Sequence, residues 1–297
     1  MTEFPTSPIF WIYPLLLIGI FVSAMVIWSK KAYRNPLALG RAEHRLPSWN
    51  LPWIDFLLLI FTIFIFTLLA QKMVGLFMPE LEGNASEHLT PQIALLSILS
   101  MHLPIGLGFI CFQKFYLKNH ALVLNPIASR IKTDLSSAGR YFLQLLPLIW
   151  ILSILWNICL GELQKLNLID DFPVQPLVEL LVQDMSLLYF LSLALSGIIL
   201  APFVEEVIFR GCLYRFLKSR MTLLSAQWVS AFIFALLHGN LHSFLPLLFI
   251  GLILARLYES SGSIYQSIAF HGFFNGTTFL FLALLKYSGL PLQVFFP

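Results

Sequence analysis

The run that decides the fold lies at residues 187–203 and reads LLYFLSLALSGIILAPF, seventeen residues without a charged side chain. A helix needs about 20 mostly apolar residues to cross the hydrocarbon core of a membrane. Only helices and closed barrels satisfy every backbone hydrogen-bonding group in that environment. The apolar runs of this chain are long and continuous and lack the alternation of barrel strands. The sequence therefore predicts an all-α, polytopic transmembrane helical bundle.

Seven further apolar runs lie on either side of this one. Together they predict about eight spans, at residues 9–28, 56–71, 91–112, 141–160, 187–203, 223–238, 244–258 and 264–285. We expect an N-terminal four-span region with external loops at residues 1–186. The second part, residues 187–297, carries the unusual polar residues described below. Both parts are expected to form a single membrane-embedded unit.

The composition excludes several classes of protein. The chain has 297 residues, of which 58% are hydrophobic and only 11% are charged, and its mean hydropathy is +0.83. A soluble domain carries about 25% charged residues. This balance excludes an ordinary soluble enzyme, a disordered chain and a nucleic-acid-binding protein. The three cysteines are far apart and show neither disulfide nor thiolate metal spacing, so we interpret them as small apolar residues.

The distribution of positive charge predicts the orientation in the membrane. Fifteen of the 18 Lys and Arg residues fall in the loops after the first, third, fifth and seventh spans, and most acidic residues fall on the opposite side. Cytoplasmic loops collect Lys and Arg. We therefore expect a multi-pass protein of the cell membrane whose N- and C-termini are both non-cytoplasmic.

The most unusual polar residues directly follow the run at 187–203. Residues 204–211 read VEEVIFRG and place Glu205, Glu206 and Arg210 among apolar neighbours. Ionisable groups inside apolar spans are costly and indicate function by default. Glu206 and Arg210 are four residues apart and can pair on a helix, whereas Glu205 points about 100° away and remains available for other chemistry. The alternative interpretation is a charge cluster at the cytoplasmic end of the span.

Two later spans carry further polar residues. The span at 223–238 ends with Phe234-Ala-Leu-Leu-His238, and the last span contains His271-Gly-Phe-Phe-Asn275. His271 and Asn275 share one helix face, about 6 Å apart along the axis. A single histidine in a membrane helix can simply hold helices together. A carboxylate, two imidazoles and an amide on three spans instead favour one shared polar site.

In this order the three elements resemble the EExxxR, FxxxH and HxxxN motifs of the CPBP intramembrane proteases. That family includes the type II CAAX prenyl endopeptidases and relatives that act on bacteriocin-type peptides. The resemblance covers about residues 190–280, whereas residues 1–185 match no such motif.

The resemblance implies a glutamate-dependent intramembrane protease that hydrolyses a peptide bond near the cytoplasmic membrane face. The residues it implies are the catalytic Glu205, His238, His271 and Asn275 and the supporting Glu206 and Arg210. Glu205 and His238 would activate the attacking water, and His271 and Asn275 would stabilise the oxyanion. The implied partners are the lipid bilayer and a peptide or protein substrate, such as a prenylated C-terminus or a small secreted peptide. No nucleic acid is expected.

The sequence leaves a zinc cofactor open. Members of the family have been described as metalloproteases as well as glutamate-dependent enzymes, and Glu205, His238 and His271 would then be the ligands. His238 and His242 also have the i, i+4 spacing of a zinc pair. They lack the glutamate of an HExxH motif, and the Gly-Asn pair between them is expected to end the helix.

Two other functions use the same polar cluster. A transporter or proton-coupled carrier is one, although the chain shows no internal repeat. A non-catalytic membrane scaffold, in which these residues only hold helices together, is the other.

Several remaining residues are interpreted as packing features. Gly272 and Gly276 form a small-xxx-small pair that would let another helix approach closely. His102 and Asn157 are interpreted as packing residues within their spans, and His242 as a loop histidine.

Overall fold

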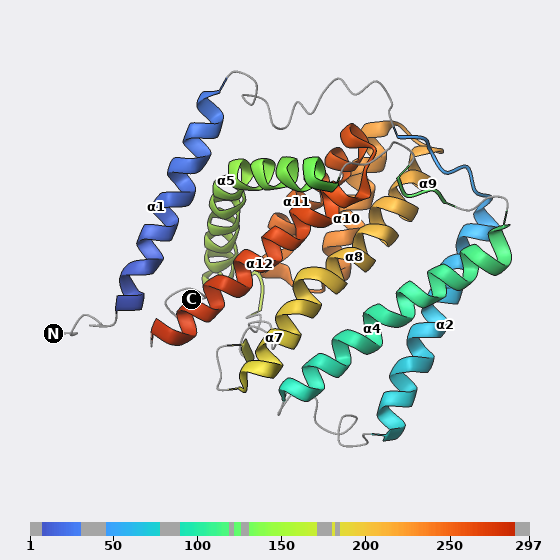
Figure 1. The fold of residues 1–297 in the computed structure, drawn as a ribbon, viewed down its shortest axis with the longest axis horizontal. Helices are drawn as coiled ribbons and strands as arrows, with labels where there is room; N and C mark the ends of the chain where they lie inside the picture. The colour runs from blue at the N-terminus through green and yellow to red at the C-terminus, as the bar shows by residue number, and fades with distance from the viewer. Residues whose placement is uncertain are drawn as a thin grey trace.

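The computed structural model describes residues 8–30, 46–77, 90–118, 122–125, 131–170, 180–181 and 185–288. These residues form a bundle of long helices and contain no strand (Figure 1), so the predicted all-α class is confirmed. The helices, with π-helical segments marked η, are α1 (Pro8–Ser29), α2 (Trp53–Phe77), α4 (Pro91–Cys111), η2 (Phe112–Leu117), α5 (Ile131–Lys165), α7 (Leu187–Leu195), η4 (Ser196–Leu200), α8 (Ala201–Glu206), η5 (Val207–Tyr214), α9 (Arg215–Lys218), α10 (Leu223–Leu237), α11 (Leu241–Ser261) and α12 (Ile264–Ser288).

All eight predicted spans correspond to helices in the described part of the chain. Six helical stretches are long and apolar enough to cross a membrane: Trp53–Leu76, Pro91–Leu117, Ile131–Lys165, Leu187–Lys218, Leu241–Ser261 and Ile264–Leu284. The other two apolar helices, Pro14–Ser29 and Leu223–Leu237, are shorter. The expected number of about eight spans is therefore roughly matched, with six that meet the length of a full crossing.

The helix around the double glutamate is much longer than the sequence predicted. The expected span ended at residue 203, but α7, η4, α8, η5 and α9 run without interruption from Leu187 to Lys218. The reason is that the residues after Glu206 are apolar again and become buried, among them Val207, Cys212 and Tyr214. The two glutamates therefore lie within a continuous helix and do not end it.

The short helix α10 ends about level with Glu205 and does not run to the far end of the bundle. Its 15 residues span about 22 Å, less than the roughly 30 Å of a hydrocarbon core. Glu205 lies 13 residues before Lys218, or about 20 Å along its own helix by the same rise. Because α9 and α10 are joined by a tight turn, the C-terminus of α10 reaches a depth similar to that of Glu205. His238 caps that C-terminus.

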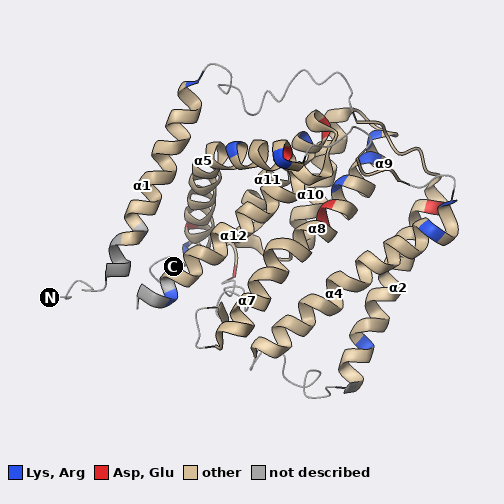
Figure 2. Ribbon diagram, viewed as in Figure 1, with Lys and Arg blue, Asp and Glu red and all other residues tan. Residues whose placement is uncertain are grey.

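One end of the bundle carries most of the described charged residues (Figure 2). We call it the basic end and define it by Arg215, Lys218 and Arg220. Arg215 donates to the carbonyls of Pro47 and Val123, Lys218 to that of Leu46, and Arg220 to that of Leu51. Lys218 also pairs with the buried Glu259 at the end of α11, with Nζ 2.6 Å from Oε1. These contacts tie together the connections that follow α1, α4, α9 and α11.

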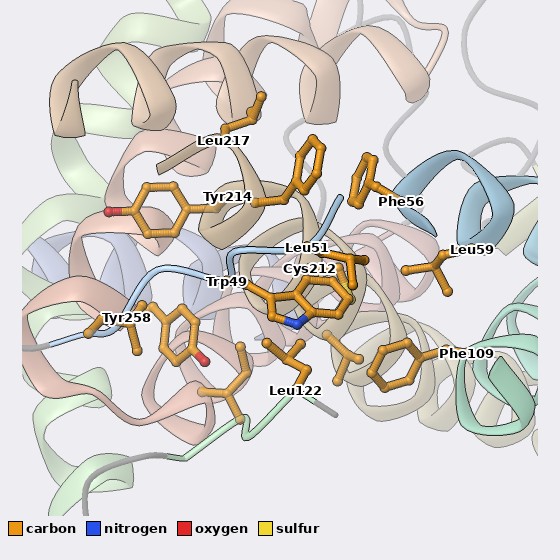
Figure 3. Close-up of a cluster of buried hydrophobic side chains, with 14 of the residues drawn as sticks. Trp49, Leu51, Phe56, Leu59, Phe109, Leu122, Cys212, Tyr214, Leu217 and Tyr258 are labelled. Atoms are coloured by element: carbon orange, nitrogen blue, oxygen red, sulfur yellow. The ribbon is translucent and has the colours of Figure 1, made fainter. Parts of the chain in front are cut away.

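A buried apolar cluster lies under these connections (Figure 3). Trp49 and Leu51 of the connection before α2 pack with Cys212, Tyr214 and other side chains of the long helix. The four connections that the charge distribution assigned to one side therefore lie at one end of the bundle, as an alternating up-and-down path requires.

Helix α12 packs closely against η4 through two glycines. A Cβ atom at Gly272 would lie 2.8 Å from the carbonyl oxygen of Ile198, whereas one at Gly276 would meet only the Ile198 side chain, at 3.7 Å or more. The prediction that this glycine pair allows another helix to approach closely is confirmed. The two positions differ in tolerance, because a backbone oxygen cannot turn aside as a side chain can.

We expect Gly272→Ala to lower the free energy of unfolding by about 1–3 kcal/mol, because the new methyl group forces α12 away from η4. Gly276→Ala is the matched control. It gains the same helix propensity but meets only ordinary contacts, and should leave stability unchanged or slightly raised. Thermal unfolding in detergent, followed by circular dichroism, measures the difference; equal melting temperatures for the two variants would contradict this packing.

Candidate active site

Glu205 lies at the meeting point of three histidines from three other helices. Its Oε1 is 3.3 Å from Nε2 of His102 on α4. Its Oε2 is 3.8 Å from Nε2 of His238 and 3.9 Å from Nε2 of His271. The side chain of Glu205 is 20% exposed, that of His238 is 28% exposed and that of His271 is 4% exposed. The structure therefore brings together the three ionisable residues that the sequence motifs singled out for catalysis.

Glu206 forms a separate, fully buried network behind this site. Its Oε1 accepts a hydrogen bond from Nη1 of Arg210 at 2.8 Å and contacts Nδ1 of His271 at 3.0 Å. Neither Glu206 nor Arg210 has any exposed side-chain surface. The predicted pairing of Glu206 with Arg210 is confirmed. The contact with His271 was not foreseen, and it links the supporting pair directly to the site.

Phe234 organises the side chains around it. Its carbonyl oxygen is 2.7 Å from Nδ1 of His238. Its ring lies under the guanidinium group of Arg210, 4.2 Å from ring centroid to Cζ, and meets both His238 and His271 edge to face. One buried aromatic residue thus orients an imidazole through its backbone and fixes three polar side chains through its ring.

The hydrogen-bond partners fix where protons sit on two of the rings. A carbonyl oxygen only accepts, so Nδ1 of His238 carries the hydrogen that it shares with Phe234. In the neutral ring its Nε2 is then a free acceptor directed at Glu205. Nδ1 of His271 likewise faces the carboxylate of Glu206, so with Glu206 ionised Nδ1 donates. Nε2 of His271 is a second donor only when that ring is doubly protonated.

One oxygen of Glu205 is left without a hydrogen bond. Its Oε2 is buried, faces the two Nε2 atoms, and has no hydrogen-bond partner among the described residues. A buried polar atom normally has a partner. Distances of 3.8 and 3.9 Å are too long for direct hydrogen bonds but suit a small polar molecule that contacts both groups.

The residues proposed for zinc stand further apart than a tetrahedral site requires. Ligands at 2.0–2.1 Å from zinc lie about 3.3 Å from one another. The Glu205 carboxylate is 3.8 and 3.9 Å from the nitrogens of His238 and His271. Within the described parts of the chain, no group of three or more His, Cys, Asp or Glu side chains is arranged to hold a metal ion. No step below depends on a metal.

The side chain of Asn275 binds a backbone carbonyl that lacks a helical partner because of Pro202. Proline lacks the N–H that would continue the helix ladder, and its ring clashes with the carbonyl one turn earlier. The chain responds by widening into η4, where the N–H of Ala201 bonds to Ser196. In such a π-helix the carbonyl of Gly197 would pair with residue 202, which has no N–H. Nδ2 of Asn275 donates to this carbonyl at 2.8 Å. An amide nitrogen carries two hydrogens, so one remains for other contacts.

The turn that carries His238 is anchored by α5. Gly239 adopts a positive φ of 62°, and Asn240 caps the start of α11 through Ser243. Nδ1 of His242 is 2.7 Å from the side-chain oxygen of Asn157, and Trp156 donates to the carbonyl of Leu241. The predicted end of the helix between His238 and His242 is confirmed, because the two histidines belong to different helices.

His102 is the residue at the site that the sequence reasoning missed. It was interpreted as a packing residue, yet its imidazole contacts Glu205. The signal that could have found it is its position: a histidine inside an otherwise uncharged 21-residue apolar helix. Such residues face the bundle interior or a cavity and pair with other polar groups. The first part of the chain, residues 1–186, therefore contributes a side chain to the site.

The part of the chain that carries the three motifs matches a known protein family. A family model described as type II CAAX prenyl endopeptidase Rce1-like matches residues 187–277. No curated protein and no solved structure matches significantly. The matched region begins with α7 and ends just after Asn275, so it contains all three motifs but not His102. The resemblance to the CPBP family is confirmed for this part of the chain.

We expect Asn275→Ala to lower the free energy of unfolding by about 1–3 kcal/mol, because the part-buried Gly197 carbonyl loses this donor. Thr278→Val on the same helix is the control, since in the described contacts the Thr278 hydroxyl bonds within its own helix. Pro202→Ala restores a backbone N–H, so Asn275→Ala should cost less in that background. Chemical unfolding of the four variants measures the coupling; equal costs with and without Pro202 would contradict this account.

Proposed function

We propose that this protein, whose residues 187–277 belong to the Rce1-like type II CAAX prenyl endopeptidase family, is an intramembrane endopeptidase with Glu205 as its general base. The observation that carries the proposal is the buried, unpartnered Oε2 of Glu205 opposite the Nε2 atoms of His238 and His271. These three groups surround a position where one water molecule would be held and activated.

Glu205 and His238 act on the water. The water donates one hydrogen to Oε2 of Glu205 and the other to the free Nε2 of His238. Its oxygen attacks the carbonyl carbon of the peptide bond while Glu205 takes the proton. The same proton then passes to the leaving amine nitrogen as the carbon–nitrogen bond breaks. A positioned base of this kind typically contributes 10²- to 10⁴-fold in rate.

His271 and Asn275 stabilise the oxyanion. His271 serves in its doubly protonated form, in which Nδ1 donates to Glu206 and Nε2 to the substrate oxygen. Asn275 would donate to the oxyanion through the amide hydrogen that is not bound to the Gly197 carbonyl. Loss of one such donor typically costs about 2.7–4 kcal/mol of transition-state stabilisation. In this scheme Glu206 and Arg210 are supporting residues, because they hold His271 and do not face the water.

The substrate we propose is a peptide or protein segment that reaches the site from the bilayer and the cytoplasmic face. Membership of the family favours a prenylated C-terminal peptide. A small secreted peptide is the other class that the resemblance implied. The site accepts an extended backbone in either case, because a scissile peptide bond must be free of helical hydrogen bonds before water can attack it.

Glu205→Gln should abolish cleavage, because the amide keeps the size of the side chain but cannot take a proton. The probe is an internally quenched, farnesylated CAAX peptide incubated with the full-length protein in lipid nanodiscs. Glu162→Gln is the control, since Glu162 is exposed and pairs only with Lys165 in the described contacts. We expect a loss of at least about 10²-fold for Glu205→Gln and none for the control.

Four outcomes would overturn this proposal. If folded Glu205→Gln cleaves the peptide at the wild-type rate, Glu205 is not the general base. Solute or ion flux without proteolysis favours a carrier, and neither activity favours a scaffold. Loss of cleavage on chelation, reversed by added zinc, replaces the metal-free mechanism.

We also propose that the basic end faces the cytoplasm, so that both termini are non-cytoplasmic. Alkaline phosphatase fused after Pro297 should be active in a bacterial host, and green fluorescent protein at the same position should be dark. Fusions after Ser261, at the basic end, should give the reverse pattern. Fluorescence from the C-terminal fusion would place the orientation the other way round.

A further inference from the structure

We propose that His102 is a positioning residue for Glu205: it binds Oε1 and thereby turns Oε2 toward His238 and His271. The inference rests on the proposed function, because it assigns His102 a task in the reaction of Glu205. It also goes beyond the three motifs, because His102 comes from α4, outside the region that matches the family.

The contact is specific in its geometry. Nε2 of His102 lies 3.3 Å from Oε1 of Glu205, and Nδ1 of the same ring lies 2.9 Å from the carbonyl oxygen of Ile98. The His102 side chain is only 9% exposed. Both ring nitrogens therefore have partners, and the ring cannot turn without losing one of them.

The partners also determine the hydrogens. The Ile98 carbonyl only accepts, so Nδ1 of His102 carries a hydrogen. The contact between Nε2 and Oε1 then holds one further proton. Glu205 can act as a base only as a carboxylate, so in the proposed reaction this proton lies on His102, whose Nε2 donates to Oε1 and fixes it. The oxygen left for chemistry is Oε2, which has no partner among the described residues.

The packing of α4 brings His102 to this place. Gly106 lies one helical turn after His102, on the same face. A Cβ at Gly106 would be 3.8 Å from the side chain of Val204, the residue before Glu205, which is an ordinary contact distance. Helices α4 and α8 therefore lie side by side at this point, next to the contact between His102 and Glu205.

A purely structural role is the competing explanation. Histidines that bond across membrane helices contribute on average about 0.6 kcal/mol. A structural His102 would lower stability when replaced and leave the turnover of the remaining folded enzyme unchanged. A positioning His102 would change kcat in protein of unchanged melting temperature, and a side chain that keeps the donor would restore it.

The first experiment compares His102→Leu with His102→Gln, using the farnesylated peptide and nanodiscs described above. The leucine variant lacks a donor and should lower kcat by about 10- to 100-fold with little change in KM, because Glu205 is no longer held in line. The glutamine amide can donate to Oε1 and should retain most of kcat. Ser100→Ala on α4 is the control, because its hydroxyl bonds only within its own helix in the described contacts.

The second experiment does not depend on activity. In protein labelled with ¹⁵N-histidine, the His102 ring signals are identified by their loss in His102→Gln. Glu205→Gln should shift the Nε2 signal of His102, because its partner changes from a carboxylate to an amide. Glu162→Gln should not shift it.

The outcomes separate this inference from the proposed function. If Glu205→Gln cleaves the peptide normally, the proposed function fails. If Glu205→Gln is inactive while folded His102→Leu keeps the wild-type kcat, the positioning role fails and the function stands. A His102 signal that does not respond to Glu205→Gln overturns the positioning role whatever the activity.

Discussion

The buried ion pair between Glu206 and Arg210 is the interaction on which the site depends. Both side chains are fully buried, and removal of one partner of such a pair typically costs 3–5 kcal/mol. The pair also joins four helices. Arg210 donates to the carbonyl of Gly251 on α11 and lies over the ring of Phe234 on α10, and Glu206 contacts His271 on α12. These contacts with α10, α11 and α12 hold the helix in place, and they thereby also fix the position of Glu205, the residue next to Glu206.

Hydropathy predicted the helices of this fold, but it did not predict where they end. Apolar runs mark the hydrocarbon core reliably, since every span needs them. The run at 187–203 stops at the double glutamate, and charges normally mark the membrane edge. Here the helix continues past them, because Arg210 pairs with Glu206 and three histidines surround Glu205. A buried charge cluster therefore looks like a helix boundary until its partners on the other helices are known.

The candidate site shows the same division between local and distant information. The pairing of Glu206 with Arg210 could be predicted, because the two residues are four positions apart on one helix. The contact of His102 with Glu205 could not, because the two residues are 103 positions apart and a single histidine in a span usually serves packing. The partner of Asn275 depends on a chain of consequences from Pro202 through the widened helix to Gly197. The spacing of residues in the sequence does not predict this contact.

The helix lengths explain how the candidate site comes together. A longer α10 would carry its last residues to the far end of the bundle, but α10 ends early, about level with Glu205. Irregular backbone at membrane depth is tolerated only where protein buries it or a polar cavity meets it. Trp156 and Asn157 of α5 donate to backbone carbonyls at the start of α11, just after the turn that carries His238. These contacts hold the turn from the α5 side, while the imidazole of His238 is directed at Glu205. Oε2 of Glu205, like Oε2 of Glu206 and Nε of Arg210, has no hydrogen-bond partner among the described residues. It is the atom that faces the Nε2 atoms of His238 and His271, where the proposed reaction would need its general base.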